Sequence, residues 1–217
     1  MKEGKNIMEN SKMAENNYVC LSGVISEECV FSHEVYGEGF YIFKTEVKRL
    51  SENEDILPVT VSERLIDINS LKRGMTVNVM GQMRSYNHYS SKKNKLILTT
   101  FAKEIEIGED ILANPNEIFL NGFICKTPVY RTTPFGREIT DLLIAVNRSY
   151  GKSDYIPCIA WGRNAKFAGG LEVGNNIEIW GRVQSRNYQK KLENDEIEER
   201  TAYEVSISKI DLIDRRW

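Results

Sequence analysis

Histidine and cysteine, the side chains that most often hold metals or carry covalent catalysis, are scarce in this sequence. The chain has two histidines and four cysteines, which are His33, His88, Cys20, Cys29, Cys125 and Cys158. No two cysteines form a C-x-x-C pair, and no histidine stands near them at zinc-site spacing. The sequence therefore predicts no metal, no cofactor and no catalytic residue. The cysteines are expected to be reduced thiols.

Long apolar segments are also missing. No run approaches the roughly 18 to 20 apolar residues that span a bilayer, and the opening segment MKEGKNIMENSKMAENN lacks the apolar core of a secretory signal. These absences predict a cytoplasmic, nucleoid-associated protein without a membrane partner. Hydrophobic residues still make up 41% of the chain and aromatics 10%, which supports packed cores and excludes general disorder.

An excess of positive charge is absent as well. The 29 lysines and arginines are balanced by 31 acidic residues, so the formal net charge is −2. Proteins that bind duplex DNA usually carry a basic stripe, whereas binders of single strands rely partly on aromatic stacking and need less net charge. The charge balance argues weakly against a nucleic-acid partner, and least against a single strand.

What the sequence does contain is one pattern repeated twice. YVCLSGVI (Tyr18–Ile25) aligns with EIFLNGFI (Glu117–Ile124), and LKRGMTVNVMGQMRSYN (71–87) aligns with LEVGNNIEIWGRVQSRN (171–187). The alignment keeps its register over most of each half, so the chain is an internal duplication. We expect a disordered tail at residues 1–16, a first domain at 17–107, a linker at 108–115 and a second domain at 116–217.

Apolar residues alternate with a period of two in each copy, which is typical of β-strands. The second copy contains IFLNGFI, ITDLLIAV, YIPCIAW, NIEIWGRVQ and AYEVSISKI, with a short helical segment, RNAKFAGG, between the third and fourth. That order matches the OB-fold, a five-stranded Greek-key barrel. We therefore predict an all-β chain of two tandem OB-folds, each with a short helix between its third and fourth strands, although the pattern alone also allows a five-stranded sheet of another topology. The acidic run at 193–200 is expected to be a solvated loop.

The second copy resembles the DNA-binding domain of bacterial single-stranded DNA-binding proteins from Asn116 to about Asp214. The segments that carry the resemblance are IFLNGFICKTPVYRTTPFGREI, LLIAVNRSYG, SDYIPCIAWGRNA, LEVGNNIEIWGRVQSRNY and TAYEVSISKI. The family's fold is the OB-fold, and four such barrels commonly assemble to wrap the strand. The first copy keeps LSGVI and the segment at 71–87 but less of the family's signature.

A stacking surface is expected on the third strand of the second copy. The period of two in YIPCIAWGR places Tyr155, Pro157, Ile159 and Trp161 on one face, followed by Arg163. Bases stack on exposed aromatics with little sequence preference, at about 1 to 3 kcal/mol per base. Taken alone, the alternation is also compatible with Trp161 in the core. The resemblance implies that these positions carry stacking aromatics.

The remaining predicted contacts lie on neighbouring segments of the second copy. The resemblance implies base stacking for Tyr150 and Tyr188 and a phosphate contact for Arg186, while Arg131, Arg182 and Lys190 are candidates for charge. In the first copy the equivalent positions are not aromatic: Ser51, Ile56, Ser62 and His88 stand there. Weaker candidates lie in the loop SYNHYSSKKNK of the first copy, namely Tyr86, Tyr89, Lys92 and Lys93. This loop is also compatible with an ordinary soluble hairpin.

These features predict sequence-independent binding and protection of single-stranded DNA in replication, repair or recombination. An alternative is a primosome-like accessory module that uses the OB scaffold mainly as a protein interface. An enzyme is a remote third, and RNA binding stays open because stacking does not distinguish the 2′-hydroxyl. Four barrels would require a homodimer of this chain. Family members often end in a flexible tail with an acidic tip, which IDLIDRRW does not resemble, so recruitment by that route is not expected.

Overall fold

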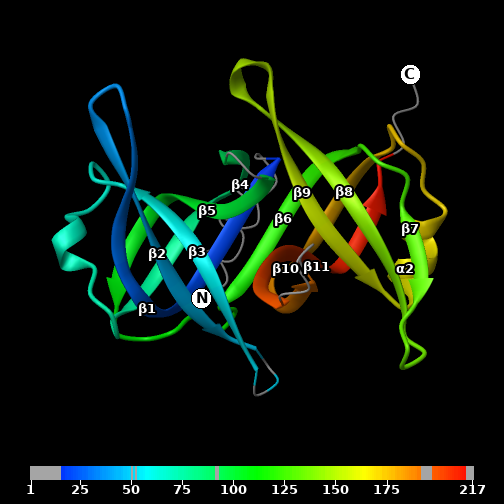
Figure 1. The fold of residues 1–217 in the computed structure, drawn as a ribbon, viewed down its shortest axis with the longest axis horizontal. Coiled ribbons are helices and arrows are strands. Elements are labelled where there is room, and N and C mark those ends of the chain that lie inside the picture. Colours follow the sequence, from blue (N-terminus) through cyan, green and yellow to red (C-terminus); the bar gives the residue numbers. More distant parts are fainter. Residues whose placement is uncertain (1–15, 50, 52, 91–92, 192–196, 214–217) are drawn as a thin grey trace, which may run out of the picture.

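The computed structural model describes residues 16–49, 51, 53–90, 93–191 and 197–213, and most of them are in strands (Figure 1). Residues 1–15 of the predicted tail lie outside the described residues. In the first half of the chain the strands are β1 (Asn17–Val35), β2 (Glu38–Lys48), β3 (Glu54–Ser62), β4 (Thr76–Ser90) and β5 (Lys93–Gly108). A single 3-10 turn, Ile68–Ser70, lies between β3 and β4.

The second half repeats this order. Its elements are β6 (Asn116–Ile124), β7 (Val129–Thr132), β8 (Glu138–Arg148), the 3-10 turn Ser149–Gly151, β9 (Lys152–Trp161), α2 (Arg163–Gly169), β10 (Asn176–Lys191) and β11 (Ile197–Leu212). Each half closes by a parallel pairing, β3 with β5 and β9 with β11, while its other strand pairs are antiparallel. The short helix expected between the third and fourth strands forms an α-helix, α2, in the second half. In the first half, the 3-10 turn Ile68–Ser70 stands at this place.

The first strand differs between the halves. In the first, β1 runs on to Val35 with three register shifts against β2. In the second, the same path is split into β6 and β7 by Cys125–Pro128. Proline has no backbone N–H to donate to the ladder and fixes its φ, so Pro128 interrupts a strand that continues where the first half has Cys29.

Each barrel has an apolar interior built from the predicted alternation. The buried side chains include Leu21, Phe43, Leu57 and Val79 in the first barrel and Leu120, Ile144, Ile156 and Ile177 in the second. Burial of a side chain of this size contributes about 1.5 to 3 kcal/mol. These interiors are the main source of stability, and they fix which residues of each strand face outward.

The glycines shared by the two copies mark close approaches in the barrels. A Cβ at Gly81 would overlap the carbonyl oxygen of Phe101, and one at Gly181 would overlap that of Ser206. Both sites lie beside a register shift, between β4 and β5 and between β10 and β11. Only glycine lets the neighbouring backbone pass so closely at these bulges.

The acidic run at 193–200 is not entirely a loop. Residues 193–196 lie outside the described residues, but Ile197–Arg200 begin β11 and pair with β10, where Arg200 is opposite Tyr188. The prediction of a solvated loop is therefore wrong for the second half of the run. The Ile197, Glu198 and Glu199 side chains are exposed and Arg200 is half-buried on a long hairpin, which composition alone does not distinguish from a loop.

One antiparallel pairing joins the two barrels into a single sheet. Residues 17–21 of β1 pair with residues 116–120 of β6, and Val19 stands opposite Ile118 at the centre. These two residues are equivalent in the repeat, so the pairing lies on an approximate twofold axis. Asn17 exchanges two hydrogen bonds of 2.8 Å with the backbone of Met83. Its equivalent Asn116 does the same with Val183.

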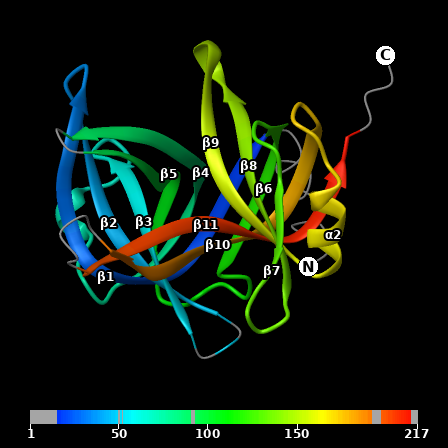
Figure 2. The ribbon, with the colours of Figure 1, turned by 45° about the vertical axis from the view of Figure 1, so that its right-hand side comes forward.

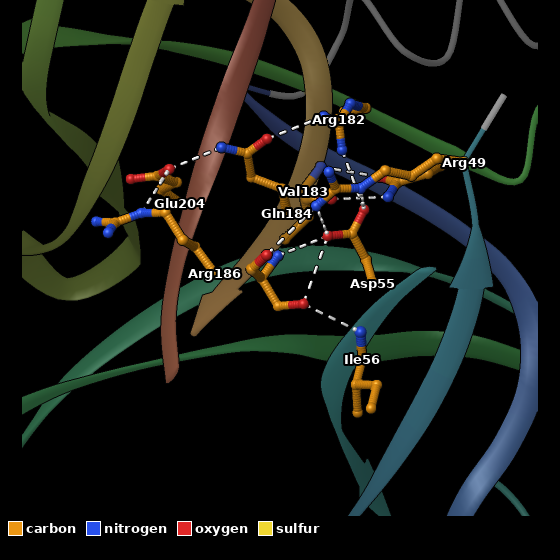
Figure 3. Close-up of polar contacts among 10 residues, drawn as sticks. Arg49, Asp55, Ile56, Arg182, Val183, Gln184, Arg186 and Glu204 are labelled. Atoms are coloured by element: carbon orange, nitrogen blue, oxygen red, sulfur yellow. Dashed lines mark hydrogen bonds and ion pairs between the residues drawn. The ribbon is translucent and has the colours of Figure 1, made fainter. Parts of the chain in front are cut away.

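Buried carboxylates of each barrel form ion pairs with arginines of the other barrel. Asp55 of β3 is fully buried, and its carboxylate contacts Arg49 at 2.6 Å and Arg182 of β10 at 3.0 Å. It also accepts a bond of 2.7 Å from the backbone N–H of Ser185 (Figure 3). The equivalent Asp154 of β9 contacts Arg84 of β4 at 3.0 Å. Buried charges need such partners, so the two barrels are held in one arrangement.

Candidate nucleic-acid interface

The outer face of β9 carries the predicted aromatic strip. Tyr155 is 47% exposed and Trp161 is 38% exposed, while the side chains that alternate with them are buried in the second barrel: Ile156, Cys158 and Ala160. Trp161 is therefore not a core residue. Ile159, which shares its face, is only 6% exposed, so the strip presents two aromatic rings with little exposed aliphatic surface between them.

Arg131 lies on the same face as Trp161. In the sheet, Arg131 of β7 is opposite Ile139 of β8, which is opposite Trp161 of β9. The Arg131 guanidinium donates a bond of 2.8 Å to the carboxylate of Asp141, and this bond raises the pKa of Arg131. Both side chains of this ion pair are at least two-fifths exposed. The pair orients the arginine beside the strip and leaves it accessible to an anion.

Tyr150 stands at the turn between β8 and β9. Its side chain is almost entirely exposed, and its backbone is left-handed, with φ 63°. Gly151 follows with φ 63°, which is the glycine-tolerant geometry of a tight hairpin turn. The turn therefore extends a tyrosine ring beyond the end of the strip, free to contact a base.

Tyr188 and Arg186 lie together on β10. The Arg186 guanidinium carbon is 5.7 Å from the centroid of the Tyr188 ring, a cation–π distance, and its Nε is 3.9 Å from a carboxylate oxygen of Glu204. Tyr188 is about one-third exposed. The two residues can offer a stacking plane next to a positive charge, as their sequence positions predict.

Arg182 is not part of this surface. Its guanidinium contacts Asp55 of the first barrel (Figure 3). Arg182 also lines a hollow of about 670 Å³ between the barrels, together with Lys48, Arg49 and the segment 112–116. Burial, with Arg49 close by, lowers the pKa of Arg182. The structure gives this arginine a role in joining the barrels, which the alternation of β10 does not reveal.

Arg163 begins α2 and lines a second hollow, of about 480 Å³, with Trp161 and Phe167. The side chains of Lys190, Tyr89 and Lys93 are outside the described part of the chain, although their backbones are in β10, β4 and β5. Lys92 lies entirely outside the described residues.

The first barrel reaches the strip through β4. The Ser85 hydroxyl accepts a hydrogen bond of 2.6 Å from the backbone N–H of Tyr155. The backbone N–H of Ser85 donates a hydrogen bond of 2.8 Å to the carboxylate of Asp154. Tyr86, one of the weaker candidates, is the next residue and is 39% exposed. In Figure 2, β10 and β11 likewise extend across the first barrel. Residues of both barrels thus border the aromatic strip.

The position equivalent to Trp161 is polar in the first barrel. Thr60 and Thr99 share a hydrogen bond of 2.9 Å, and the Ser62 hydroxyl binds the carboxylate of Glu38. Thr60 and Ser62 are buried, so this face offers no aromatic ring where the second barrel has Trp161. The aromatic ring next to Ser62 is packed instead of presented: Phe40 stands opposite Ser62 in the sheet, is buried, and lies 5.7 Å from Phe101 and 5.0 Å from His33.

Three exposed aromatics of the second barrel were missed in the sequence. Tyr130, Phe135 and Phe167 all have at least two-fifths of their side-chain surface exposed. The signal for the first two was their place among Arg131 and Arg137 in a segment rich in turn-forming residues. Phe167 follows no strand pattern, because it is on the exposed side of α2.

The topology and the strip define the class: this is a tandem OB-fold protein with an aromatic face on its second barrel. The model of the Single-strand binding protein family matches residues 115–213, the segment that forms the second barrel. The resemblance seen in the sequence is confirmed over this segment. The description of that family names binding and no catalysed reaction.

Curated relatives align with the same half of the chain. The chain is 35% identical over 83 residues to single-stranded DNA-binding protein 1 of Staphylococcus aureus. It is 34% identical over 83 residues to single-stranded DNA-binding protein A of Bacillus subtilis. The alignments cover 35% of this chain, and the chain spans about half the length of these relatives.

A solved structure matches both barrels together. The wild-type single-stranded DNA binding protein from Thermus aquaticus superposes with a TM-score of 0.71 over 92% of this chain and 93% of that chain, at 19% identity. This likeness concerns the fold, and it confirms the prediction of two tandem OB-folds. Within the described residues, no helix has the length and apolar character that crossing a membrane requires.

Proposed function

We propose that this protein binds single-stranded DNA without sequence preference, through the aromatic strip of its second barrel. The observation that carries the proposal is that Tyr155 and Trp161 are exposed on the outer face of β9 while their neighbours fill the barrel. A flat, exposed ring accepts any base, because every base has a π-face. The family match to the same barrel supports this choice of ligand.

Phosphates are held by arginines on either side of the strip. Arg131 lies two strands from Trp161, and Arg186 lies beside Tyr188, each next to an acidic side chain that orients it. The single-stranded DNA runs from Tyr150 across β9 toward Tyr188, and β4 of the first barrel borders its path. Covering exposed strands in this way suits replication, repair and recombination, which take place at the nucleoid in the cytoplasm.

The proposal is tested by titrating the full chain with fluorescent oligo-dT at several salt concentrations. Binding should weaken as salt rises, because cations released from the strand return to it. An oligo-dA or mixed sequence of the same length should bind within about tenfold, since stacking is sequence-tolerant. If oligo-dT does not bind even at low salt, the proposal is wrong.

A second candidate function, an accessory protein-interaction module, is favoured by one observation. The first barrel has the buried, hydrogen-bonded Ser62 at the position where the second barrel has the exposed Trp161, so the aromatic strip is not repeated there. Replacing Tyr155 and Trp161 by Ala distinguishes the two functions. Loss of oligo-dT affinity supports DNA binding, whereas unchanged affinity favours the accessory role.

A homodimer would supply four barrels. On the outer face of the joined sheet, Tyr18 of β1, Phe119 of β6 and Trp180 of β10 stand in one row, and the Phe119 and Trp180 rings are 5.1 Å apart. Phe119 is buried, so a second copy placed on this row would cover the half-buried Tyr18 and Trp180, and aromatic residues are enriched in such interfaces. Sedimentation of the wild type and of Trp180→Glu should give a dimer and a monomer, respectively.

A further inference from the structure

The two barrels present equivalent hairpins with the same exposed apolar side chains. One consists of residues 26–38, the outer half of β1 and its turn, and the other of residues 125–137, which include β7 and its turn. Each exposes a valine and an aromatic residue on the strand and a second aromatic at the tip: Val30, Phe31 and Tyr36 in one, Val129, Tyr130 and Phe135 in the other. Tyr36 and Phe135 are almost entirely exposed.

The charges on the two hairpins are opposite. Residues 26–38 contain four glutamates and no lysine or arginine: Glu27, Glu28, Glu34 and Glu38. Residues 125–137 contain three basic residues and no acidic one: Lys126, Arg131 and Arg137. We refer to them as the acidic hairpin and the basic hairpin. The duplication has thus kept the apolar positions while the charge has reversed.

Both hairpins also have an open strand edge. Beyond Ile25, the outer half of β1 pairs only with β2 in the described residues. β7 is the last strand of the sheet and pairs only with β8. An open edge offers unpaired backbone N–H and C=O groups to another strand, and such edges are common sites of strand addition.

The hairpins point toward opposite ends of the molecule. In Figure 1 the turn of the acidic hairpin is at the upper left and that of the basic hairpin at the lower right. The two cannot contact each other within one chain in this arrangement. A contact between unlike ends of two molecules leaves one acidic and one basic end free, so it can repeat without closing.

We propose that the acidic hairpin of one molecule docks against the basic hairpin of the next, so that the protein forms open head-to-tail chains. The occupant of each hairpin is therefore a second copy of this protein. Opposite charges guide the encounter, the exposed Phe31 and Tyr130 rings pack together, and the two open edges pair. Docking between two acidic hairpins is disfavoured because it would bring eight glutamates together.

The proposal does not depend on DNA binding, so it is tested on the full chain without DNA. Sedimentation velocity is measured over a range of concentrations at low salt and at about 1 M salt, where the Debye length is ~3 Å. At low salt, the sedimentation coefficient of the wild type should increase with protein concentration. It should exceed that of the discrete species seen at high salt. A wild type that keeps one size at low salt at every concentration overturns the proposal.

Two charge-reversal variants make the test specific. In the first, Glu27, Glu28 and Glu34 are replaced by Lys, so that both hairpins are basic. In the second, Lys126 and Arg137 are replaced by Glu, so that both are acidic. Neither variant should associate alone beyond the discrete species, but an equimolar mixture should associate as the wild type does. A mixture that fails to associate, or a single variant that still does, contradicts the proposal.

A matched control carries the same change of charge at another place. Glu106, Glu109 and Asp110 are exposed around the end of β5, outside both hairpins. Replacing all three by Lys changes the net charge as much as the acidic-hairpin variant does. The control should associate like the wild type. If it does not, overall charge and not the hairpin governs association, and the proposal is wrong.

Discussion

The backbone N–H of Ser185 on β10 donates a hydrogen bond of 2.7 Å to the carboxylate of Asp55 on β3 of the other barrel. The repeat reproduces this contact in reverse, because the N–H of Ser85 on β4 binds Asp154 on β9 at 2.8 Å. Each aspartate is fully buried and also contacts an arginine of the opposite barrel. The two barrels are therefore interlocked by two equivalent polar clusters, and they should unfold together.

Removal of one buried aspartate should destabilise the whole chain. Asp55→Ala leaves Arg49, Arg182 and the Ser185 N–H without their acceptor, and loss of one partner of a buried ion pair costs about 3 to 5 kcal/mol. Urea unfolding followed by circular dichroism should show a single transition at lower urea. The exposed Asp110→Ala should change the free energy of unfolding by less than about 0.5 kcal/mol. Two separate transitions in the wild type would contradict the interlocked arrangement.

Arg182 and Arg186 are both on β10, but their replacement should have different effects on DNA affinity and on stability. Arg186→Ala removes a phosphate contact, so the slope of log affinity against log salt should fall by about 0.7, the value for one charge on a single strand. Arg182→Ala removes a partner of Asp55 and should lower stability while the slope stays unchanged. Oligo-dT titrations at four salt concentrations, with urea unfolding of both variants, check this. Equal slopes for both variants would refute the separate roles.

The bulge glycines should not tolerate a methyl group. In Gly81→Ala and Gly181→Ala the new Cβ would overlap a carbonyl oxygen of the neighbouring strand, so backbone must shift, at a cost of about 1 to 3 kcal/mol. Gly170→Ala is the matched control, since its Cβ would meet the nearest atom at 3.5 Å, an ordinary contact. Thermal unfolding of the three variants compares them. A Gly81→Ala protein as stable as the control would show that the bulge can relax.

The thiol of Cys158 should be unreactive in the folded protein. Burial raises the pKa of this thiol well above its usual value, so the reactive thiolate is disfavoured at pH 8. Burial also raises the pKa of Cys29, to about 11. A colorimetric thiol assay should detect Cys158 only after denaturant is added. Both thiols have a higher pKa in the folded state than in the unfolded chain. The stability that this difference supports is present below the unfolded-state pKa, and it is lost as the pH rises through the folded-state pKa.

Much of the fold could be predicted from the sequence because local pattern determines it. Alternation in YIPCIAW separated the buried Ile156 from the exposed Tyr155, and the repeat fixed the same strand order in both halves. These features depend on residues within one strand or one turn, so no distant contact was needed to infer them.

The contacts between the barrels could not be predicted in the same way. Alternation places Arg182 on the same face as Arg186, yet its partner is Asp55, 127 positions away in the chain. Ile159 is on the outward face of β9 but is nearly buried. Burial of an outward side chain depends on what packs across the sheet, and a single sequence does not show that.

Tryptophan fluorescence during oligo-dT titration tests the central claim, that bases stack on the strip of the second barrel, most directly. Trp161 and Trp180 are both on outward faces, but only Trp161 lies on β9. We predict that oligo-dT quenches the wild type and Trp180→Phe to a similar extent, and that Trp161→Phe loses most of the quenching. Quenching that survives in Trp161→Phe and disappears in Trp180→Phe would contradict the account.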